Sequence, residues 1–316
     1  MWLAAAPPTT IPTLTAGATP MALVDVLIPT CGRKTALAIT LTGLLAQTFQ
    51  DFDVTIADQT TGDRYLDDGE VRTLFRALAL RGHRVRALVN LPRRGMAQQR
   101  HFLLEQAQAP LVHFLDDDVL LGPTMLERLV RVMQEEHCGF VGAGVSGLRH
   151  LDDPWPDDMP FEPWQGPVRP EPLTWATIPW QRYRLHIRDN PLHLTRRYAA
   201  DGRTVRYKVV WVGANVLYDR EKLLSVGGFR WWDRLPPHHS GEEVLVQLLL
   251  ARRYGGCAIL PAEAYHLELP SQVPERDVKA DHMFEELAPL LAPLEDEVPT
   301  ASHTSPGPGA SHTAGT

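Results

Sequence analysis

Residues 111–119 read Leu-Val-His-Phe-Leu-Asp-Asp-Asp-Val, an apolar run that ends abruptly in three carboxylates. The run is typical of a buried strand in an α/β sheet, whose carboxyl end faces a ligand crevice. Three adjacent carboxylates repel one another, and each costs several kcal/mol to bury without a partner. We therefore expect a cation beside Asp116, Asp117 and Asp118, and a hard divalent metal that also holds substrate phosphates is the favoured one. An acidic loop in water is the alternative.

Strands and helices alternate on both sides of this run. Short links between them predict an α/β fold with a mainly parallel, Rossmann-like sheet, helices on both faces and right-handed crossovers. The first, second and fourth strands end in Pro29-Thr30, Asp58 and Asp116–Asp118, so these residues are expected at one edge of the sheet. Strands are expected at 24–28, 52–57, 85–89, 111–115 and 140–145, and helices at 35–47, 71–80, 96–106 and around 125–133.

The alternation breaks between residues 147 and 208. Residues 154–180 contain eight prolines and four of the chain's eight tryptophans, too much Trp for a disordered linker and too much Pro for a long helix. Residues 182–208 contain seven arginines and one lysine against two aspartates. We expect an irregular, packed insertion whose basic part is either a solvated face or a cationic wall near a phosphate or an acidic acceptor. Regular structure resumes beyond it, with strands at 207–212, 215–218, 258–260 and 264–267 and helices at 220–225 and 241–254.

Composition limits the class of protein. The chain has 316 residues, 44% of them apolar, and a formal net charge of −7, which allows a large core and argues against a nucleic-acid partner. No run approaches the ~20 apolar residues that cross a bilayer, although docking on a membrane surface stays open. The three cysteines are odd in number and show no zinc spacing, which fits a reducing, cytoplasmic compartment. We expect disorder at 1–22, which lacks the features of a signal peptide, and at 298–316.

Three residues of the first half are candidates for contacts with a nucleotide. Asp58 suits a base or a ribose, although Asp before Thr60-Thr61-Gly62 is also typical of a turn. Gly95 allows a close backbone approach of a ligand or begins the next helix. Arg100, in the second turn of that helix, suits a phosphate or the acidic cluster, and an exposed helix arginine is the alternative.

The second half places aromatic and acidic residues near one another. Trp231-Trp232 precedes Ser240–Glu243, and aromatic rings beside carboxylates suit a sugar, whose faces are apolar and whose rim carries hydroxyls. Glu242 and Glu243 open a helix, where they have either a chemical role or a structural one, because Ser240-x-x-Glu243 is also a capping-box pattern. His266 ends a short strand and is a candidate metal ligand through a ring nitrogen.

In this order and spacing, the segments resemble glycosyltransferase family 2, whose members have the GT-A fold. The resemblance runs from about Val24 to His266, apart from the insertion. Each segment is short, and their order and spacing together are specific. They are Val-Leu-Ile-Pro-Thr at 26–30, Ile-Ala-Asp ending at 58, Arg94-Gly95 with Arg100, Phe-Leu-Asp-Asp-Asp at 114–118, Gly-Ala-Asn at 213–215, Gly-Gly-Phe at 227–229, Gly-Glu-Glu at 241–243 and Tyr-His at 265–266.

The resemblance implies different functions for different parts of the chain. Residues 23–146 would bind a nucleotide sugar, 147–208 would be the insertion, and 209–297 would bind the acceptor and carry the catalytic base. Pro29 and Thr30 would edge the nucleotide pocket, with Asp58 on the uracil or ribose. Gly95, Arg100 and Asp117 are further candidates for donor binding.

The acidic residues acquire distinct roles through the same resemblance. Asp116–Asp118 matches the family's Asp-x-Asp element, so Asp118 would bind Mn²⁺ or Mg²⁺ and Asp116 would contact the ribose or a metal-bound water. His266 matches a histidine that completes the metal shell in some relatives. Gly-Glu-Glu stands where the family usually has Glu-Asp, which makes Glu243 the expected base and keeps Glu242 as the other candidate.

A metal-dependent inverting glycosyltransferase is therefore the leading hypothesis. The donor would be a nucleoside diphosphate sugar, UDP-sugar first, and the acceptor a saccharide, a lipid-linked compound or a small molecule. A sugar-1-phosphate nucleotidyltransferase is one alternative, for which Cys31-Gly32-Arg33-Lys34 is a short, imperfect match to a basic Gly-rich loop. A non-catalytic carbohydrate- or nucleotide-binding protein of the same fold is the other.

Overall fold

The computed structural model describes residues 21–62, 65–152, 160–186, 190–272 and 277–291. The two segments expected to be disordered, 1–22 and 298–316, lie outside these ranges except for Met21 and Ala22, which belong to no helix or strand. Parts of the insertion, at 153–159 and 187–189, also lie outside them.

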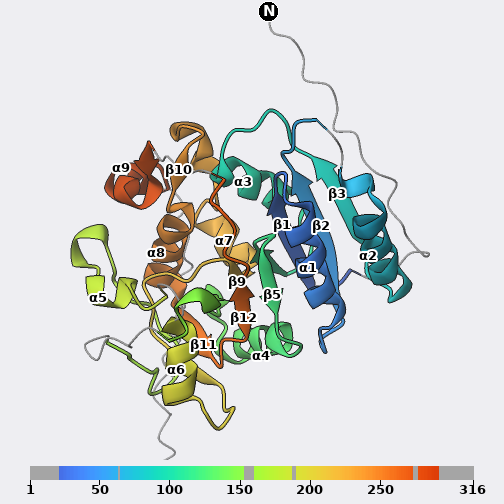
Figure 1. Cartoon of the computed structure of the whole chain (residues 1–316). Coiled ribbons are helices and arrows are strands. Elements are labelled where there is room, and N and C mark those ends of the chain that lie inside the picture. The colour runs from blue at the N-terminus through green and yellow to red at the C-terminus, as the bar shows by residue number, and fades with distance from the viewer. Residues whose placement is uncertain (1–20, 63–64, 153–159, 187–189, 273–276, 292–316) are drawn as a thin grey trace, which may run out of the picture.

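A mixed sheet of eight strands forms the centre of the described part (Figure 1). Four strands run parallel in the order β3, β2, β1, β4. β9 lies antiparallel between β4 and β6, β11 is parallel to β6, and β8 is antiparallel at the edge. The mainly parallel α/β sheet is thus confirmed, with β8 and β9 opposing the rest. The strands are β1 Val24–Thr30, β2 Phe52–Asp58, β3 Val85–Val89, β4 Leu111–Leu115, β6 Phe140–Gly142, β8 Val205–Tyr207, β9 Asn215–Asp219 and β11 Gly256–Leu260.

Helices flank this sheet (Figure 1). β1, β2 and β4 are buried along their whole length, as expected for parallel strands that are covered on both faces. α3 packs on β1 and β2, and α1 packs on α2. The principal helices are α1 Lys34–Leu45, α2 Gly69–Leu80, α3 Met96–Gln106, α4 Met125–Glu136, α7 Arg220–Ser225, α8 Glu242–Tyr254 and α9 Phe284–Leu291.

A second, three-stranded sheet brings a C-terminal histidine to the acidic residues. β12 pairs antiparallel with β5, and in this register His266 lies opposite Val119. Because Val119 directly follows Asp118, the pairing places His266 next to the last aspartate of the cluster. The strands of this sheet are β5 Val119–Leu121, β7 Ser146–Gly147 and β12 Ala264–His266.

The insertion is packed, with short elements. It contains α5 Trp180–Tyr183 and α6 Asn190–Tyr198, and it ends in β8, so the strand expected at 207–212 is formed by 205–207 instead. Arg182 is buried and pairs with Glu162 at 2.8 Å and Glu171 at 3.2 Å. Among the described residues of 182–208, no arginine or lysine lines the cavity that opens at the carboxyl ends of β1 and β4. These ion pairs give Arg182 a structural role.

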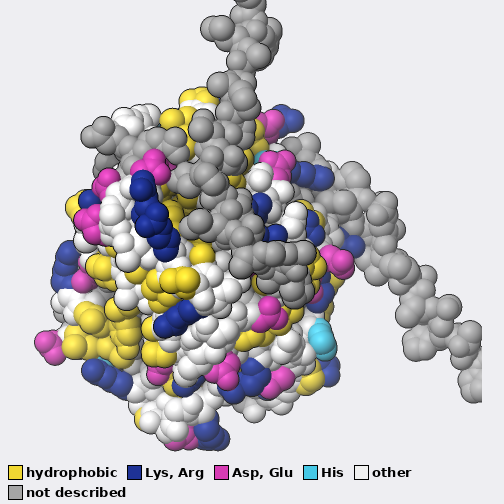
Figure 2. Space-filling view, turned by 90° about the vertical axis from the view of Figure 1, so that its right-hand side faces the viewer, with side chains coloured by type: hydrophobic (Ala, Val, Ile, Leu, Met, Phe, Trp, Pro, Cys, Tyr) yellow, Lys and Arg dark blue, Asp and Glu magenta, His cyan; other side chains and the backbone are white. Residues whose placement is uncertain are grey.

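The outer surface carries both signs of charge. On the face that lies at the right of Figure 1, where α2 is found, acidic and basic side chains are interspersed (Figure 2). Within the described ranges, no helix combines the length and the apolarity that a membrane span requires.

Candidate active site

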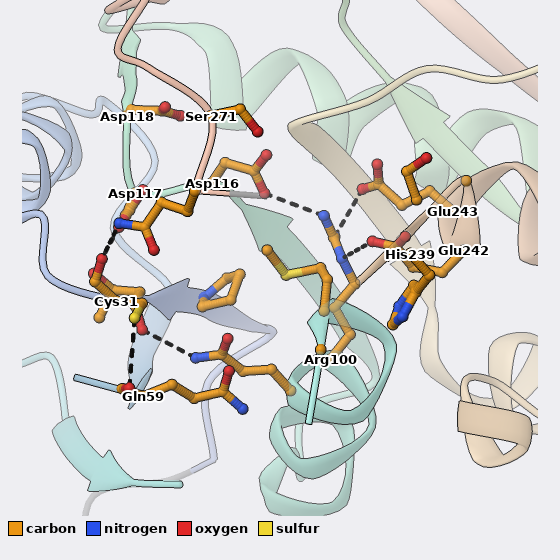
Figure 3. Close-up of a pocket in the computed structure, with 18 of the residues that line it drawn as sticks. Cys31, Gln59, Arg100, Asp116, Asp117, Asp118, His239, Glu242, Glu243 and Ser271 are labelled. Carbon is orange, nitrogen blue, oxygen red and sulfur yellow. Dashed lines mark hydrogen bonds and ion pairs between the residues drawn. The ribbon is translucent and has the colours of Figure 1, made fainter. Parts of the chain in front are cut away.

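A cavity of about 600 Å³ opens at the carboxyl ends of β1 and β4 (Figure 3). The starts of α3 and α8 and the segment after β12 form its other walls. Parallel strands deliver their carboxyl ends to one edge, which is why the sequence-predicted residues meet here. Those that line it are Pro29, Thr30, Gly95, Arg100, Asp116, Asp117, Asp118, Glu242, Glu243 and His266.

Asp58 is the predicted site residue that does not line the cavity. Its Oδ1 accepts hydrogen bonds from the backbone N of Thr60 at 2.8 Å and from Thr60 Oγ1 at 2.5 Å. This is the turn that the sequence allowed as the structural alternative. The next residue, Gln59, lines the cavity instead. A contact between Asp58 and a base or ribose stays a prediction.

Asp117 anchors the acidic loop to the interior. Its Oδ2 accepts a 2.6 Å hydrogen bond from Thr30 Oγ1, and its backbone carbonyl accepts one from Thr40 Oγ1 at 2.9 Å. Burial raises the pKa of Asp117 to about 7, against the opposing effect of the Thr30 hydrogen bond. A carboxyl group held this way fixes the loop and lies too deep to be the most accessible ligand.

Asp118 faces two cationic or potentially cationic groups. Nη1 of Arg33 lies 2.5 Å from Asp118 Oδ2 and 3.3 Å from Asp117 Oδ1. His266 Nε2 lies 3.4 Å from the same Asp118 oxygen. Burial and the charge of Asp116 raise the pKa of Asp118, while His266 and Arg33 lower it. The positive charge that the sequence required at this loop thus comes in part from Arg33, a residue noted only within the basic segment after the first strand.

Arg100 connects the acidic loop to the start of α8 (Figure 3). Its Nη2 lies 3.2 Å from Asp116 Oδ1, its Nε 3.3 Å from Glu242 Oε1, and its Nη1 2.7 Å from Glu243 Oε1. The side chain is only 3% exposed. Of the possibilities that the sequence left open, contact with the acidic cluster is therefore the one observed in this structure. A single guanidinium faces three carboxylates.

The pKa of Glu243 reflects both its burial and the charges around it. The pKa of Glu243 is raised to about 8, mainly by burial; the charge of Arg100 lowers it, and the charges of Asp116 and Glu242 add to the rise. The same carboxylates raise the pKa of Arg100, which stays charged. A carboxyl group with so high a pKa is a stronger base than an exposed glutamate, and it ionises mainly above neutral pH.

The start of α8 differs from the capping-box alternative. Gly241, with φ of 90°, is the residue that caps the helix, and no side chain makes the capping hydrogen bond. Ser240 therefore precedes the cap, and Glu243 is free of the reciprocal bond that a capping box needs. Both glutamates lie in the first helical turn, where the helix dipole favours carboxylates.

His239 is a residue that sequence reasoning missed. Its Nε2 accepts a 3.0 Å hydrogen bond from the backbone N of Ala97, and its Nδ1 donates to the carbonyl of Pro236 at 2.7 Å. It thereby fixes the start of α3, the helix that carries Arg100. A Cβ on Gly95 would lie 2.5 Å from the His239 ring and 2.7 Å from the Pro237 carbonyl, so this glycine is needed for helix packing. No local pattern links these segments.

Next to Glu243 the cavity wall is aromatic. Trp211 and Tyr183 line it, with ring centroids 5.7 Å apart, and the indole Nε1 donates to the Tyr183 carbonyl at 3.1 Å. A Cβ on Gly213 would lie 2.6 Å from the Trp211 ring and 3.4 Å from Glu243 Oε2. Gly213 thus lets the ring and the carboxylate approach each other. Tyr183 comes from α5 of the insertion.

Two side chains fit a divalent metal. Asp118 Oδ2 and His266 Nε2 lie 3.4 Å from each other, close enough to bind the same ion. No group of three or more His, Cys, Asp or Glu side chains suited to a metal occurs among the described residues. A nucleotide-dependent Mg²⁺ or Mn²⁺ needs only one or two protein ligands, because phosphates and water supply the others. Asp118 and His266 therefore fit as the protein ligands of a metal that binds together with a nucleotide.

Arg100→Ala is expected to destabilise the fold, because it leaves three buried or half-buried carboxylates without their shared cation. The predicted loss is about 3–5 kcal/mol in the free energy of unfolding, measured by urea denaturation. Arg76→Ala, on the exposed side of α2, is the matched control and should change stability by less than about 0.5 kcal/mol. An Arg100→Ala protein as stable as the wild type would contradict the central role of this ion-pair group.

Comparison with known proteins assigns the chain to a family through its first two thirds. The family model described as Glycosyl transferase family 2 matches residues 25–203. A search of curated proteins finds no match. The crystal structure of S. aureus TarS 1–349 in complex with UDP-GlcNAc superposes with a TM-score of 0.55 at 15% sequence identity, over 86% of this chain and 66% of that chain. The S. aureus TarS structure gives a TM-score of 0.52 at 16% identity, over 77% of this chain and 36% of that chain.

These solved structures share the fold at low identity, and the chain spans less than two thirds of their length. The family model covers more than half of the chain, including all of β1 but its first residue, β2 and the acidic loop after β4. The chain therefore belongs to glycosyltransferase family 2, with the GT-A fold that the sequence segments predicted.

Proposed function

We propose that the protein is a metal-dependent inverting glycosyltransferase that moves a sugar from a UDP-sugar to an acceptor hydroxyl. One observation carries this proposal: the acidic loop Asp116–Asp118 and the carboxylate of Glu243 face one cavity and are joined by Arg100. A donor whose diphosphate lies at the acidic loop would present its sugar toward Glu243. The solved complex of TarS with UDP-GlcNAc supports the choice of donor class.

The donor would lie across the carboxyl ends of β1, β2 and β4. Pro29 and Thr30 line the cavity there and suit the nucleoside, and Asp58 lies opposite Thr30 on the neighbouring strand. Asp118 and His266 would hold Mn²⁺ or Mg²⁺, and Asp116 would contact the ribose or a metal-bound water. The bound metal would supply positive charge to the departing diphosphate.

Glu243 is the proposed base. Its raised pKa, about 8, suits a group that must take a proton from an acceptor hydroxyl. Attack on the anomeric carbon from the face opposite the diphosphate inverts the configuration and needs no covalent enzyme intermediate. Glu242 is the second candidate, and its ion pair with Arg100 Nε at 3.3 Å suggests that it orients this arginine.

The acceptor would enter along the aromatic wall. Trp211 and Tyr183 line the cavity on the side of Glu243, and flat aromatic faces suit the apolar faces of a sugar ring. Saccharides, lipid-linked acceptors and small molecules all remain within the proposal. We propose a cytoplasmic protein with no nucleic-acid partner, from its composition and charge.

The two basic residues on which the nucleotidyltransferase alternative depends, Arg33 and Lys34, form ion pairs in this structure. Arg33 contacts Asp118 and Lys34 lies 2.9 Å from Asp68. Incubation with a sugar 1-phosphate and a nucleoside triphosphate tests that alternative, because it would release pyrophosphate. Nucleotide-sugar binding without any turnover would favour the non-catalytic alternative.

The first prediction of the proposal concerns donor turnover. Wild-type protein with Mn²⁺ should release UDP from at least one UDP-sugar, and EDTA should abolish the release. Asp118→Asn removes a metal ligand, so it should weaken Mn²⁺-dependent donor binding at least about tenfold. Asp68→Asn is the control, because it changes a solvent-accessible carboxylate that forms an ion pair with Lys34. This variant should behave as wild type. Full metal-dependent turnover by Asp118→Asn would refute the metal assignment.

A second prediction separates the two glutamates. Glu243→Gln should lower the transfer rate at least about a hundredfold, the usual contribution of a positioned base. Donor affinity, measured by calorimetry, should stay near the wild-type value. Glu242→Gln should retain most of the turnover. The reverse pattern would move the base by one position.

The pH dependence provides a third prediction. Because the pKa of Glu243 is raised to about 8 from 4.5, the ionised fraction of the base grows as pH rises. kcat/KM should therefore increase with pH and level off above a pKa near 8. Glu242→Gln removes a negative neighbour that raises this pKa, so the rise should shift to lower pH. A flat profile from about pH 6 to about pH 9 would exclude Glu243 as the titrating base.

A further inference from the structure

Arg33 lies on the ligand atom that the proposed metal needs. Its Nη1 is 2.5 Å from Asp118 Oδ2 and 3.3 Å from Asp117 Oδ1. His266 Nε2 is 3.4 Å from the same Oδ2. Asp118 Oδ2 and His266 Nε2, the two atoms that fit a divalent ion, thus lie where the guanidinium of Arg33 already supplies positive charge.

The contact is well shielded from water. The side chain of Arg33 is 17% exposed and that of Asp118 only 4%. Both the attraction of Arg33 to the aspartates and its repulsion of another cation are therefore stronger than on an open surface. A divalent ion takes a carboxylate oxygen at ~2.0–2.6 Å, which would set it against the guanidinium. Arg33 and a divalent ion consequently compete for Asp118.

A diphosphate would resolve this competition. Arg33 lies in the loop directly after β1 and lines the candidate active-site cavity. A planar guanidinium matches phosphate oxygens with two parallel hydrogen bonds. Its Nη2 donates to the neutral carbonyl of Pro270 at 2.6 Å, a weaker acceptor than a phosphate oxygen. A bound diphosphate would thus offer Arg33 a better partner and leave Asp118 to the metal.

We propose that Arg33 is an internal counter-cation of the acidic loop that couples metal binding to the binding of a nucleoside diphosphate. It holds metal affinity low in the free protein and moves to the phosphates when nucleotide and metal bind together. The inference rests on the proposed function, since it needs a cavity that takes a nucleotide. By linkage, the nucleotide raises the metal affinity by the factor with which the metal raises the nucleotide affinity.

The test measures Mn²⁺ affinity of the full chain from the electron paramagnetic resonance signal of free Mn²⁺. Without nucleotide, Arg33→Gln should bind Mn²⁺ about tenfold more tightly than wild type, a typical coupling factor. UDP should raise Mn²⁺ affinity strongly in wild type and much less in Arg33→Gln. Arg93→Gln is the matched control: Arg93 lines the same cavity but donates to the Gln272 carbonyl at 3.4 Å. It should keep both the weak Mn²⁺ binding and the coupling to UDP.

Unchanged or weaker Mn²⁺ binding by Arg33→Gln overturns the proposal. If that variant is less stable, Mn²⁺ must raise its Tm more than it raises the wild-type Tm, and an equal rise also counts against the proposal. Asp118→Asn in the Arg33→Gln background should abolish the gained affinity, and a retained gain would place the metal elsewhere. These measurements involve no transfer, so a protein that shows the coupling but transfers no sugar contradicts the proposed function alone.

Discussion

One buried guanidinium joins the two sides of the cavity. Arg100 is the point at which Asp116, from the loop after β4, meets Glu242 and Glu243, from the start of α8. One positive charge among three carboxylates leaves a buried group with net negative charge, which is costly unless a proton or another cation joins it. The pKa of Glu243 is raised to about 8, mainly by burial and in part by the charges of Asp116 and Glu242. The imbalance that makes this group costly to fold also favours a ligand that carries a cation.

The three adjacent aspartates tolerate one another because each faces a different part of the fold. Asp116 faces Arg100 on α3, Asp117 accepts a 2.6 Å hydrogen bond from Thr30 on β1, and Asp118 lies between Arg33 and His266. Mutual repulsion is thus offset by partners from separate elements. If Arg33 leaves Asp118, Asp117 loses its 3.3 Å contact with the same guanidinium but keeps its hydrogen bond from Thr30, and Asp116 keeps Arg100. Asp118, which faces both Arg33 and His266, is thus the aspartate suited to an exchange of partner.

Local patterns in the sequence predicted the elements that carry the site. The run 111–115 forms β4 with the expected bounds, and the parallel pairing of β1 to β4 follows from alternation with helices, whereas the antiparallel β9 beside β4 does not. The contacts between distant segments had no such signal. Arg33 reaches Asp118, and His239 supports the start of α3, only because the chain folds back. Ser240 fitted a capping box, yet a glycine with positive φ begins the helix instead, which short-range spacing does not reveal.

Arg100 also makes the proposed base sensitive to the donor. The charge of Asp116 raises the pKa of Glu243, and the charge of Arg100 lowers it. A cation that binds at the acidic loop weakens the field of Asp116 and leaves Arg100 more strongly engaged with the glutamates. Coulomb's law then drives the pKa of Glu243 downward. On the proposed function, the metal at the acidic loop therefore favours the ionised base, whereas the negative charge of the diphosphate that accompanies the metal has the opposite effect.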